Sequence, residues 1–338
     1  MSHRDPTFRA VLVRVTERLS RLLGGEGTHS CVLFAGSGTG AMEAIISSLH
    51  GELMILTNGR YSERIGLIAE RFGVPTKRHP LPEREPPDLV GLERAIEATP
   101  SLTHLALVHH ETTTGALLPL TAIGEIVERH GLRLIVDGVS SVGGHDLHLV
   151  RDQVDYLSLN PNKCLESLPG VGLVLARNEL LDELGGKARS FYFDLHAQWR
   201  RLQRGEVPYT VPVQVTCALD IAVRRLEEEG YGPRVERYAR IAAHARRALG
   251  EAGFHRIELP EPIRGNVITT MKLPKDVEFE RLHDLLLEDG VTIYSDSATI
   301  ASGRFFVATM GSITEADVDR AVGCLKAATW ERPAESLA

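Results

Sequence analysis

The sequence predicts an α/β fold: a large domain with a mostly parallel sheet between helices, followed by a smaller C-terminal α+β domain. Six short runs rich in Val, Leu and Ile alternate with helical stretches, and such nearly continuous apolarity is typical of parallel strands buried on both faces. This rhythm stops near residue 215, where longer helical segments begin. At 338 residues the chain also exceeds the size at which a single hydrophobic core stops growing, which favours two domains.

Each expected element has its own periodicity and boundary signals. Residues 6–23 place apolar side chains at helical spacing and stop at Gly24-Gly25, so the first element is an amphipathic helix. The expected strands of the large domain are 31–35, 53–57, 104–109, 133–137, 155–159 and 171–176. In the smaller domain the expected helices are 214–230, 233–251, 278–289 and 315–328, and the expected strands are 265–271, 291–294 and 304–309.

These elements divide the chain into four parts. The N-terminal helix, 1–25, is expected to pack on the small domain. Residues 26–220 form the large domain, 221–330 the small domain, and 331–338 a frayed tail.

Composition excludes several classes of function. The chain has 45 acidic and 38 basic residues and no basic patch with interleaved aromatics, which argues against nucleic-acid binding. No apolar run reaches the roughly 18 residues that a membrane span needs. The N-terminus has no secretory pattern, and the four cysteines form neither a zinc motif nor a disulfide framework, so we expect a cytoplasmic protein.

A glycine-rich turn, Gly36-Ser37-Gly38-Thr39-Gly40, lies between the first expected strand and a helix. Glycines let the backbone approach an anion, the helix N-terminus offers free N–H groups, and Ser37 and Thr39 add hydroxyls, which suits a phosphate monoester. A tight strand-to-helix turn explains the motif equally well. It is neither a Walker loop nor a complete GxGxxG dinucleotide fingerprint.

Four more polar side chains follow later strands. Asp137 closes a strand, where its carboxylate is desolvated unless it meets a cation such as a protonated pyridine nitrogen. Lys163 follows the strand 155–159, and an amine with a lowered pKa forms imines with aldehydes. Tyr61 could stack on a planar ring and Thr112 could donate to a ring hydroxyl. Each side chain alone has a common structural explanation, but one bound pyridoxal phosphate would use them all, because the carboxyl ends of these strands share one edge.

At these residues the chain resembles the class V aminotransferases of pyridoxal-phosphate fold type I, most of all 2-aminoethylphosphonate:pyruvate transaminases and, next, alanine–glyoxylate transaminases. The resemblance runs from about residue 30 to 220. Its stretches are GSGTGAMEA, LTNGRYSERI, HLALVHHETTTGALLPL, LIVDGVSSVGGHDL, VDYLSLNPNKCLESLPGVGLVLAR, ARSFYFDLHAQWR and YTVPVQVTCAL.

The resemblance implies a role for each matching residue. Lys163 would hold the cofactor as a Schiff base and shuttle the proton, and Asp137 would pair with the pyridine nitrogen. Tyr61 would stack on the ring with Val139 on the opposite face, and Thr112 would contact the ring hydroxyl.

The same resemblance implies a phosphate site and a homodimer. Ser37, Gly38, Thr39 and Asn162 would hold the phosphate. The active sites would lie at the dimer interface, with Thr210 reaching the phosphate of the neighbouring subunit.

Two departures from the family concern the substrate. The Gly-Pro segment with which members usually begin has no match in this chain, and Phe306 stands where the family places a carboxylate-binding arginine. Arg304, two residues earlier on the same strand face, and Arg264 are candidates to replace it. His110 is a further candidate to line the substrate pocket.

The sequence therefore predicts a pyridoxal-phosphate-dependent aminotransferase that uses a small amine or amino acid and a keto acid. A lyase or decarboxylase remains an alternative, because the same cofactor chemistry serves both. Intact Lys163 and Asp137 argue against a silent binding module, and the incomplete glycine fingerprint argues against a dehydrogenase. The adjacent pair His109-His110 is not expected to share a metal, since neighbouring residues of a strand point to opposite faces. His145 and His148 have a spacing that could bind one, but a solvated turn is the preferred interpretation, so no metal is expected.

Overall fold

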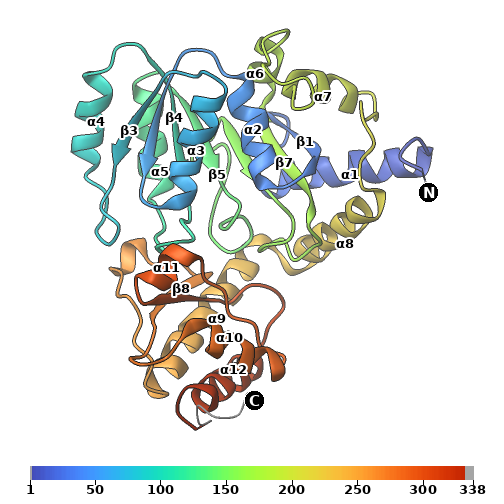
Figure 1. The fold of residues 1–338 in the computed structure, drawn as a ribbon. Coiled ribbons are helices and arrows are strands. Elements are labelled where there is room, and N and C mark those ends of the chain that lie inside the picture. The colour runs from blue at the N-terminus through green and yellow to red at the C-terminus, as the bar shows by residue number, and fades with distance from the viewer. Residues whose placement is uncertain (1, 332–338) are drawn as a thin grey trace.

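The computed structural model describes residues 2–331, which form a large sheet with helices around it and a second, smaller sheet (Figure 1). The strands of the large sheet are β1 (His29–Gly36), β2 (Glu52–Thr57), β3 (Thr76–Pro80), β4 (Leu102–Val108), β5 (Arg133–Asp137), β6 (Tyr156–Leu159) and β7 (Gly170–Arg177). Their order is β1-β7-β6-β5-β4-β2-β3. Only β7 pairs antiparallel with its neighbours in this sheet, which confirms the predicted mostly parallel α/β fold.

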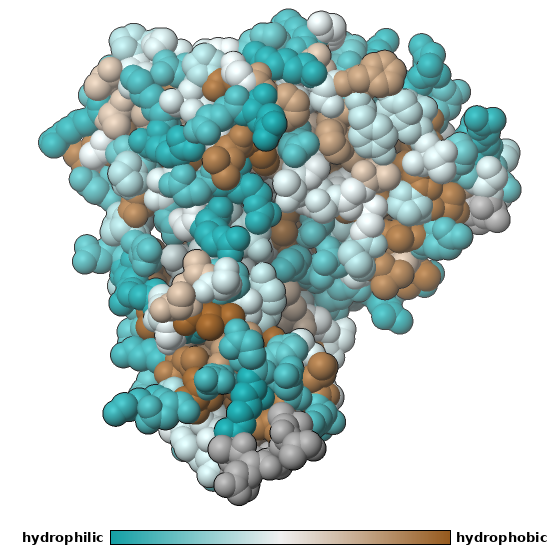
Figure 2. All heavy atoms as spheres, viewed as in Figure 1, coloured by the Kyte–Doolittle hydropathy of each residue, from teal (hydrophilic) through white to brown (hydrophobic). Residues whose placement is uncertain are grey.

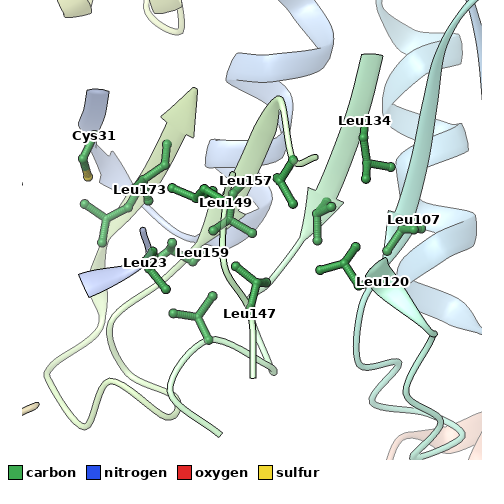
Figure 3. Close-up of a cluster of buried hydrophobic side chains, with 14 of the residues drawn as sticks. Leu23, Cys31, Leu107, Leu120, Leu134, Leu147, Leu149, Leu157, Leu159 and Leu173 are labelled. Carbon is green, nitrogen blue, oxygen red and sulfur yellow. The ribbon is translucent and has the colours of Figure 1, made fainter. Parts of the chain in front are cut away.

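Six helices accompany the large sheet. They are α2 (Gly38–Ser48), α3 (Arg60–Arg71), α4 (Leu89–Glu97), α5 (Leu120–Arg129), α6 (Asn178–Glu183) and α7 (Leu195–Leu202). Alternate residues of the central strands face two separate hydrophobic clusters. Leu105 and Leu107 of β4 lie in one cluster, whereas Ala106 lies in the other. This burial on both faces explains the nearly continuous apolarity of the strands. Figure 3 shows part of the first cluster, in which Leu134, Leu157 and Leu173 come from three different strands.

The second part of the chain has a sheet and a core of its own. Strands β8 (Ile268–Lys272) and β9 (Arg304–Ala308) pair antiparallel, and the accompanying helices are α9 (Tyr231–Glu251), α10 (Phe279–Glu288), α11 (Ser297–Ala301) and α12 (Glu315–Lys326). Helix α8 (Val213–Glu229) precedes them, and its Leu219, Val223 and Leu226 belong to the large core. A 3₁₀ turn at Glu261–Ile263 and a π-helical turn at Ala327–Glu331 complete the elements. Helix α8 runs through the expected domain boundary at residue 220, so the point of division stays a prediction. The expected tail, apart from Glu331, lies outside the described residues.

Helix α1 (Pro6–Leu22) contacts α8 and β1, and its Phe8 and Leu12 join the large core. Its expected packing on the small domain stays a prediction. The expectation of a strand over 291–294 was wrong. No strand forms over 291–294, where Tyr294 makes only an isolated bridge to Phe306. A single bridge leaves the remaining backbone groups of this stretch outside any ladder, so its apolar residues serve packing rather than sheet formation.

Charged and polar residues cover most of the face in Figure 2, with smaller hydrophobic patches on the upper and lower parts. Within residues 2–331, none of the helices combines the length and the apolarity that crossing a membrane requires.

Candidate active site

A cavity of about 150 Å³ lies at the carboxyl edge of the large sheet. It brings together side chains that follow β1, β2, β5 and β6, which lie far apart in the sequence. The lining includes Ser37, Gly38, Thr39, Tyr61, Asp137, Val139, Asn160 and Lys163. Most residues that the sequence singled out for a cofactor therefore meet in one place, because parallel strands end at the same edge of the sheet.

The turn between β1 and α2 forms one wall of this cavity. Ser37 is the N-cap of α2, yet its hydroxyl makes no capping hydrogen bond to the helix. A Cβ atom on Gly38 would lie 2.4 Å from Val139 Cγ2, so this position requires glycine. Free N–H groups at a helix N-terminus attract anions, and the glycine lets the cavity extend to the helix backbone.

Arg64 of α3 adds a cation to the same wall. Its Nη1 donates to Thr39 Oγ1 at 3.2 Å, and its guanidinium carbon lies 4.6 Å from the centre of the Tyr61 ring. The sequence analysis did not select Arg64. Its spacing offers a signal, because Arg64 lies three residues after Tyr61 and therefore near it on a helix surface.

Asp137 ends β5 at the floor of the cavity. The backbone N–H of Val139 donates to its Oδ1 at 2.9 Å. Burial raises the pKa of Asp137 to about 6, while nearby Arg64 and Lys163 act in the opposite direction. A desolvated carboxylate is stabilised when a cationic group binds beside it, so this floor favours a positively charged ring atom.

Lys163 lies in the loop after β6 and lines both this cavity and a larger neighbouring one. Burial lowers its pKa below the ordinary lysine value. A larger fraction of neutral amine follows, and the neutral amine is the form that attacks a carbonyl carbon.

A buried carboxylate that the sequence analysis missed, Glu111, fixes the position of Tyr61. Its Oε2 accepts from the backbone N–H groups of Tyr61 at 3.2 Å and Ser62 at 3.1 Å, at the start of α3. Its Oε1 accepts from the backbone and the hydroxyl of Thr113 at 3.1 and 2.8 Å. Glu111 thus provides the N-terminal cap that Gly59, lacking a side chain, cannot provide.

Thr112 lines the larger cavity, and its Oγ1 lies 3.0 Å from Ser140 Oγ. Tyr61 and Lys163 line this cavity too, and its volume is about 340 Å³. Phe306 forms another part of its wall. Tyr61 and Lys163 line both cavities, so these two side chains lie where the cavities meet.

Asn162 is exposed and does not line either cavity, whereas Asn160, directly after β6, lines the smaller one. Among the described residues, Asn160 Oδ1 is buried and has no hydrogen-bond partner. Asn160 is therefore the better candidate to contact a bound group. The two asparagines of Asn160-Pro161-Asn162 are alike in sequence, and only the path of the loop separates them.

The three residues suggested for the substrate lie outside both cavities. Arg264 donates to the carbonyl of Leu259 through Nε and Nη2, at 3.2 and 2.8 Å. Arg304 opposes Lys272 in the small sheet. His110 is buried, with its Nδ1 lying 3.2 Å from the carbonyl oxygen of Ser140. Thr210 is exposed, and its expected contact with a neighbouring subunit stays a prediction.

Three histidines form a buried group below the site. The ring centres of His110 and His145 lie 4.8 Å apart, and those of His109 and His145 lie 6.2 Å apart. Burial lowers the pKa of His109 to about 3 and that of His110 to about 4, so both are neutral at pH 7. Across residues 2–331, no three His, Cys, Asp or Glu side chains come together as metal ligands.

The family match and the most similar curated relatives point to the same family of enzymes. The family described as Aminotransferase class-V matches residues 1–307. The 2-aminoethylphosphonate–pyruvate transaminase of Pseudomonas aeruginosa strain UCBPP-PA14 is 36% identical over 336 residues, covering 97% of this chain and 90% of the relative. The enzyme of the same name from Syntrophobacter fumaroxidans is 33% identical, covering 95% and 88%.

Solved structures agree. The alanine–glyoxylate aminotransferase of Nostoc sp. superposes with a TM-score of 0.90 at 25% identity, covering 97% of this chain and 89% of that one. The fold also matches that of the ureidoglycine–glyoxylate aminotransferase of Bacillus subtilis, with a TM-score of 0.89 at 24% identity and coverage of 97% and 86%.

Proposed function

The chain belongs to the class V aminotransferases, and on that premise we propose that it is a pyridoxal-phosphate-dependent enzyme that moves an amino group from a small primary amine or amino acid to a keto acid. One observation supports this proposal above the others. A buried carboxyl group, Asp137, and a lysine with a lowered pKa, Lys163, line the same cavity as a helix N-terminus suited to phosphate.

The residues of the cavity fit pyridoxal phosphate. The α2 N-terminus with Ser37, Gly38 and Thr39 suits the phosphate group. The unpartnered Asn160 Oδ1 could accept a hydrogen bond from a donor group of the bound cofactor. Asp137 suits the cationic ring nitrogen. Tyr61 and Val139 provide the two surfaces between which a planar ring would lie.

When bound, pyridoxal phosphate supplies an aldehyde that captures amines and a cationic ring that withdraws electrons. Lys163 Nζ would hold the cofactor at rest. With substrate bound, Lys163 Nζ would accept the proton from the substrate carbon that bears the amino group and would donate it to the cofactor carbon that carries the aldehyde. Asp137 would keep the ring nitrogen protonated, and Tyr61 would hold the ring in one plane.

Thr112 and Ser140 support this arrangement from the side of the larger cavity. Their hydroxyl oxygens lie 3.0 Å apart, so one can donate to the other and leave a donor free for the ring hydroxyl. Glu111 is a positioning residue, since it acts through Tyr61 and the start of α3.

The proposal includes a homodimer in the cytoplasm. An exposed aromatic group supports the dimer: the Phe191 side chain is 87% exposed, and Tyr192 stacks on Tyr209 with ring centres 4.9 Å apart. A Cβ atom on Gly40 would lie 3.2 Å from Phe193, so this segment adjoins the phosphate turn. Thr210 follows Tyr209 directly.

The four free cysteines support a reducing compartment, which is the basis for proposing the cytoplasm.

The test is a half-reaction followed by product analysis. The purified holoenzyme is mixed with 2-aminoethylphosphonate or alanine without a keto acid, and its visible absorbance is recorded. We expect the long-wavelength absorbance of the bound cofactor to disappear, with pyridoxamine phosphate and a carbonyl product formed in equal amounts. Pyruvate should then restore the spectrum.

Two other results would contradict the proposal. Cleavage or loss of CO₂ from the substrate with no pyridoxamine phosphate would favour the lyase or decarboxylase alternative. A protein that binds no pyridoxal phosphate would exclude the whole class of chemistry.

A further inference from the structure

The larger cavity extends well beyond Lys163. It begins at Tyr61, Thr112 and Lys163 and continues along β9 toward α9 and α12, where Leu249 and Leu325 line it. Its volume of about 340 Å³ falls within the range of small-molecule sites, roughly 300–1,000 Å³. A substrate amine held at Lys163 would place its remaining atoms in this space.

The walls of this cavity are mainly apolar. Ile268, Phe306 and Met310 pack in one cluster with Cys164, which directly follows Lys163, and Phe306 is 2% exposed. Tyr294 covers Phe306 with nearly parallel rings, 27° apart. These side chains favour methyl and methylene groups and offer little that would replace water around an ion.

Among the described residues that line this cavity, only Lys163 and Asp317 are charged. Lys163 is committed to the cofactor in the proposed function. Asp317 is negative and already accepts from the backbone and hydroxyl of Thr314, at 2.8 and 2.7 Å. A phosphonate or carboxylate in the deeper part of the cavity would therefore be desolvated without a cation beside it.

Three arginines considered for this region, Arg60, Arg64 and Arg264, are engaged elsewhere. Arg60, next to Tyr61, pairs with Asp296 at 2.9 Å. Arg64 donates to Thr39, and Arg264 donates to the carbonyl of Leu259. None of these three guanidinium groups lines the larger cavity.

We propose that the cavity walled by Ile268, Phe306 and Met310 receives the substrate's side chain, and that the preferred amine carries an uncharged, mainly apolar group there. This inference rests on the proposed aminotransferase function and names its substrate class. It also makes Phe306 a specificity-determining residue.

A matched pair of amines tests the inference. The compound 3,3-dimethylbutylamine has the shape of 2-aminoethylphosphonate, with a neutral tert-butyl group in place of the charged phosphonate. Half-reaction rates of the wild-type holoenzyme are measured with each amine at several concentrations. We expect the second-order rate constant of the neutral amine to be at least tenfold higher. In the series ethylamine, propylamine, butylamine, we expect roughly a fourfold gain per methylene.

A cation introduced into the wall should reverse the preference. Ala308 is exposed and lines the cavity on the same strand face as Phe306, so Ala308→Arg is expected to fold. This variant should raise the rate with 2-aminoethylphosphonate relative to the neutral amine by tenfold or more. Ala301→Arg, exposed on α11 and outside the cavity, should leave the ratio unchanged.

The possible failures are distinguishable. Equal rates for the two amines, or a faster reaction with the phosphonate, overturn the inference and leave the aminotransferase function standing. If neither amine nor alanine converts the holoenzyme, the proposed function fails and this inference with it.

Discussion

At the scale of single residues, burial destabilises the ionised carboxylate of Asp137 unless a cation binds beside it. Its carboxyl group lies at a buried strand end, and burial raises its pKa from 3.8 to about 6. The ionised form is therefore less favourable in the folded chain than in the unfolded chain. A cofactor with a cationic ring nitrogen would remove this penalty, which links the position of Asp137 to cofactor binding.

The first prediction concerns Asp137→Asn in the cofactor-free protein. Because the folded pKa is raised, the stability associated with the protonated group is fully present below the unfolded value of 3.8 and is lost as pH rises through about 6. At pH 7.5 the variant should therefore be more stable than wild type, by up to about 3 kcal/mol. The difference should shrink toward zero near pH 4.

Urea unfolding at the two pH values measures this effect. Asp146→Asn, at an exposed carboxylate paired with Arg151, is the control and should change stability little. The holoenzyme should respond in the opposite sense, since D137N removes the partner of the ring nitrogen and weakens cofactor binding. A cofactor-free D137N that is less stable than wild type at pH 7.5 would contradict this interpretation.

Sequence reasoning identified residues at strand ends better than residues that act through backbone contacts. Asp137 and Lys163 can be picked out from the sequence, because a charged side chain at a buried strand end is unusual. Glu111 cannot, because its function depends on the N–H groups of a helix more than 45 residues earlier in the chain. The sequence alone cannot decide between Asn160 and Asn162, because the path of the loop determines which amide faces the cavity.

At the scale of elements, the start of α3 depends on a side chain from another segment. Glu111 accepts from Tyr61 and Ser62, and the side chain of Glu111 is fully buried. Glu111→Ala should therefore lower the free energy of unfolding by about 2–4 kcal/mol, because it leaves buried donors without an acceptor.

Chemical denaturation of the cofactor-free protein measures the loss. Glu125→Ala, on the exposed surface of α5, is the matched control and should change stability by less than about 0.5 kcal/mol. Cofactor affinity should fall as well in E111A, since Tyr61 loses its fixed position. Equal stabilities for the two variants would show that the cap does not hold the helix.

The N-terminus of α2 is the second critical element. A methyl group at Gly38 would clash with Val139 at 2.4 Å, whereas a Cβ atom at Gly250 of α9 meets nothing within 4 Å. We expect Gly38→Ala to weaken pyridoxal phosphate binding at least tenfold. Gly250→Ala should bind normally and gain up to about 1 kcal/mol of stability, because alanine favours helices. Calorimetric titration with pyridoxal phosphate compares the affinities of the two variants. Normal affinity in G38A would show that the turn at Gly38 does not contribute to cofactor binding.

The strands with continuous apolarity were predictable, because burial on both faces leaves a direct trace in composition. The stretch 291–294 has the same composition but forms no strand, since pairing depends on a neighbour that supplies hydrogen bonds. Strand β3 was missed for the opposite reason. It is an edge strand with exposed Lys77 and Arg78, so its sequence lacks the apolar run.

At the scale of the whole molecule, a partly buried ionic network connects the lysine loop to the small domain. Glu166, three residues after Lys163, accepts from Arg237 at 2.8 Å, Tyr238 at 3.0 Å and Ser312 at 2.7 Å. Arg234, which is 2% exposed, lies 3.7 Å from the same carboxylate. These partners lower the pKa of Glu166.

Breaking this network should loosen the two parts of the chain. Glu166→Gln should lower the free energy of unfolding by about 1–3 kcal/mol at pH 7, because it leaves charged groups partly unpaired. Since the folded pKa of Glu166 is lowered, its contribution is present above about pH 4.5 and is lost as pH falls further.

The exposed pair Arg256–Glu258 supplies the control, because a screened surface pair contributes little. Thermal unfolding at pH 7 of E166Q and Glu258→Gln compares a partly buried network with a surface pair. A loss of stability in E258Q as large as that in E166Q would show that the Glu166 network stabilises the protein no more than an exposed ion pair does.

The position of α1 depends on the whole fold and could not be predicted from its own pattern. The apolar stripe of residues 6–23 predicts a partner but does not say which one. The structure supplies it through β1 and α8, and the charged face pairs Arg18 with Asp220 and Glu227.

The central claim is that Lys163 carries the cofactor, and mapping the attachment site tests it most directly. The holoenzyme is treated with borohydride to fix the cofactor covalently, digested, and analysed by peptide mass spectrometry. We expect the added mass on the peptide that contains Lys163 and none on peptides with other lysines such as Lys187. Attachment to another lysine, or no attachment in a protein that retains the cofactor, would contradict the proposed active site.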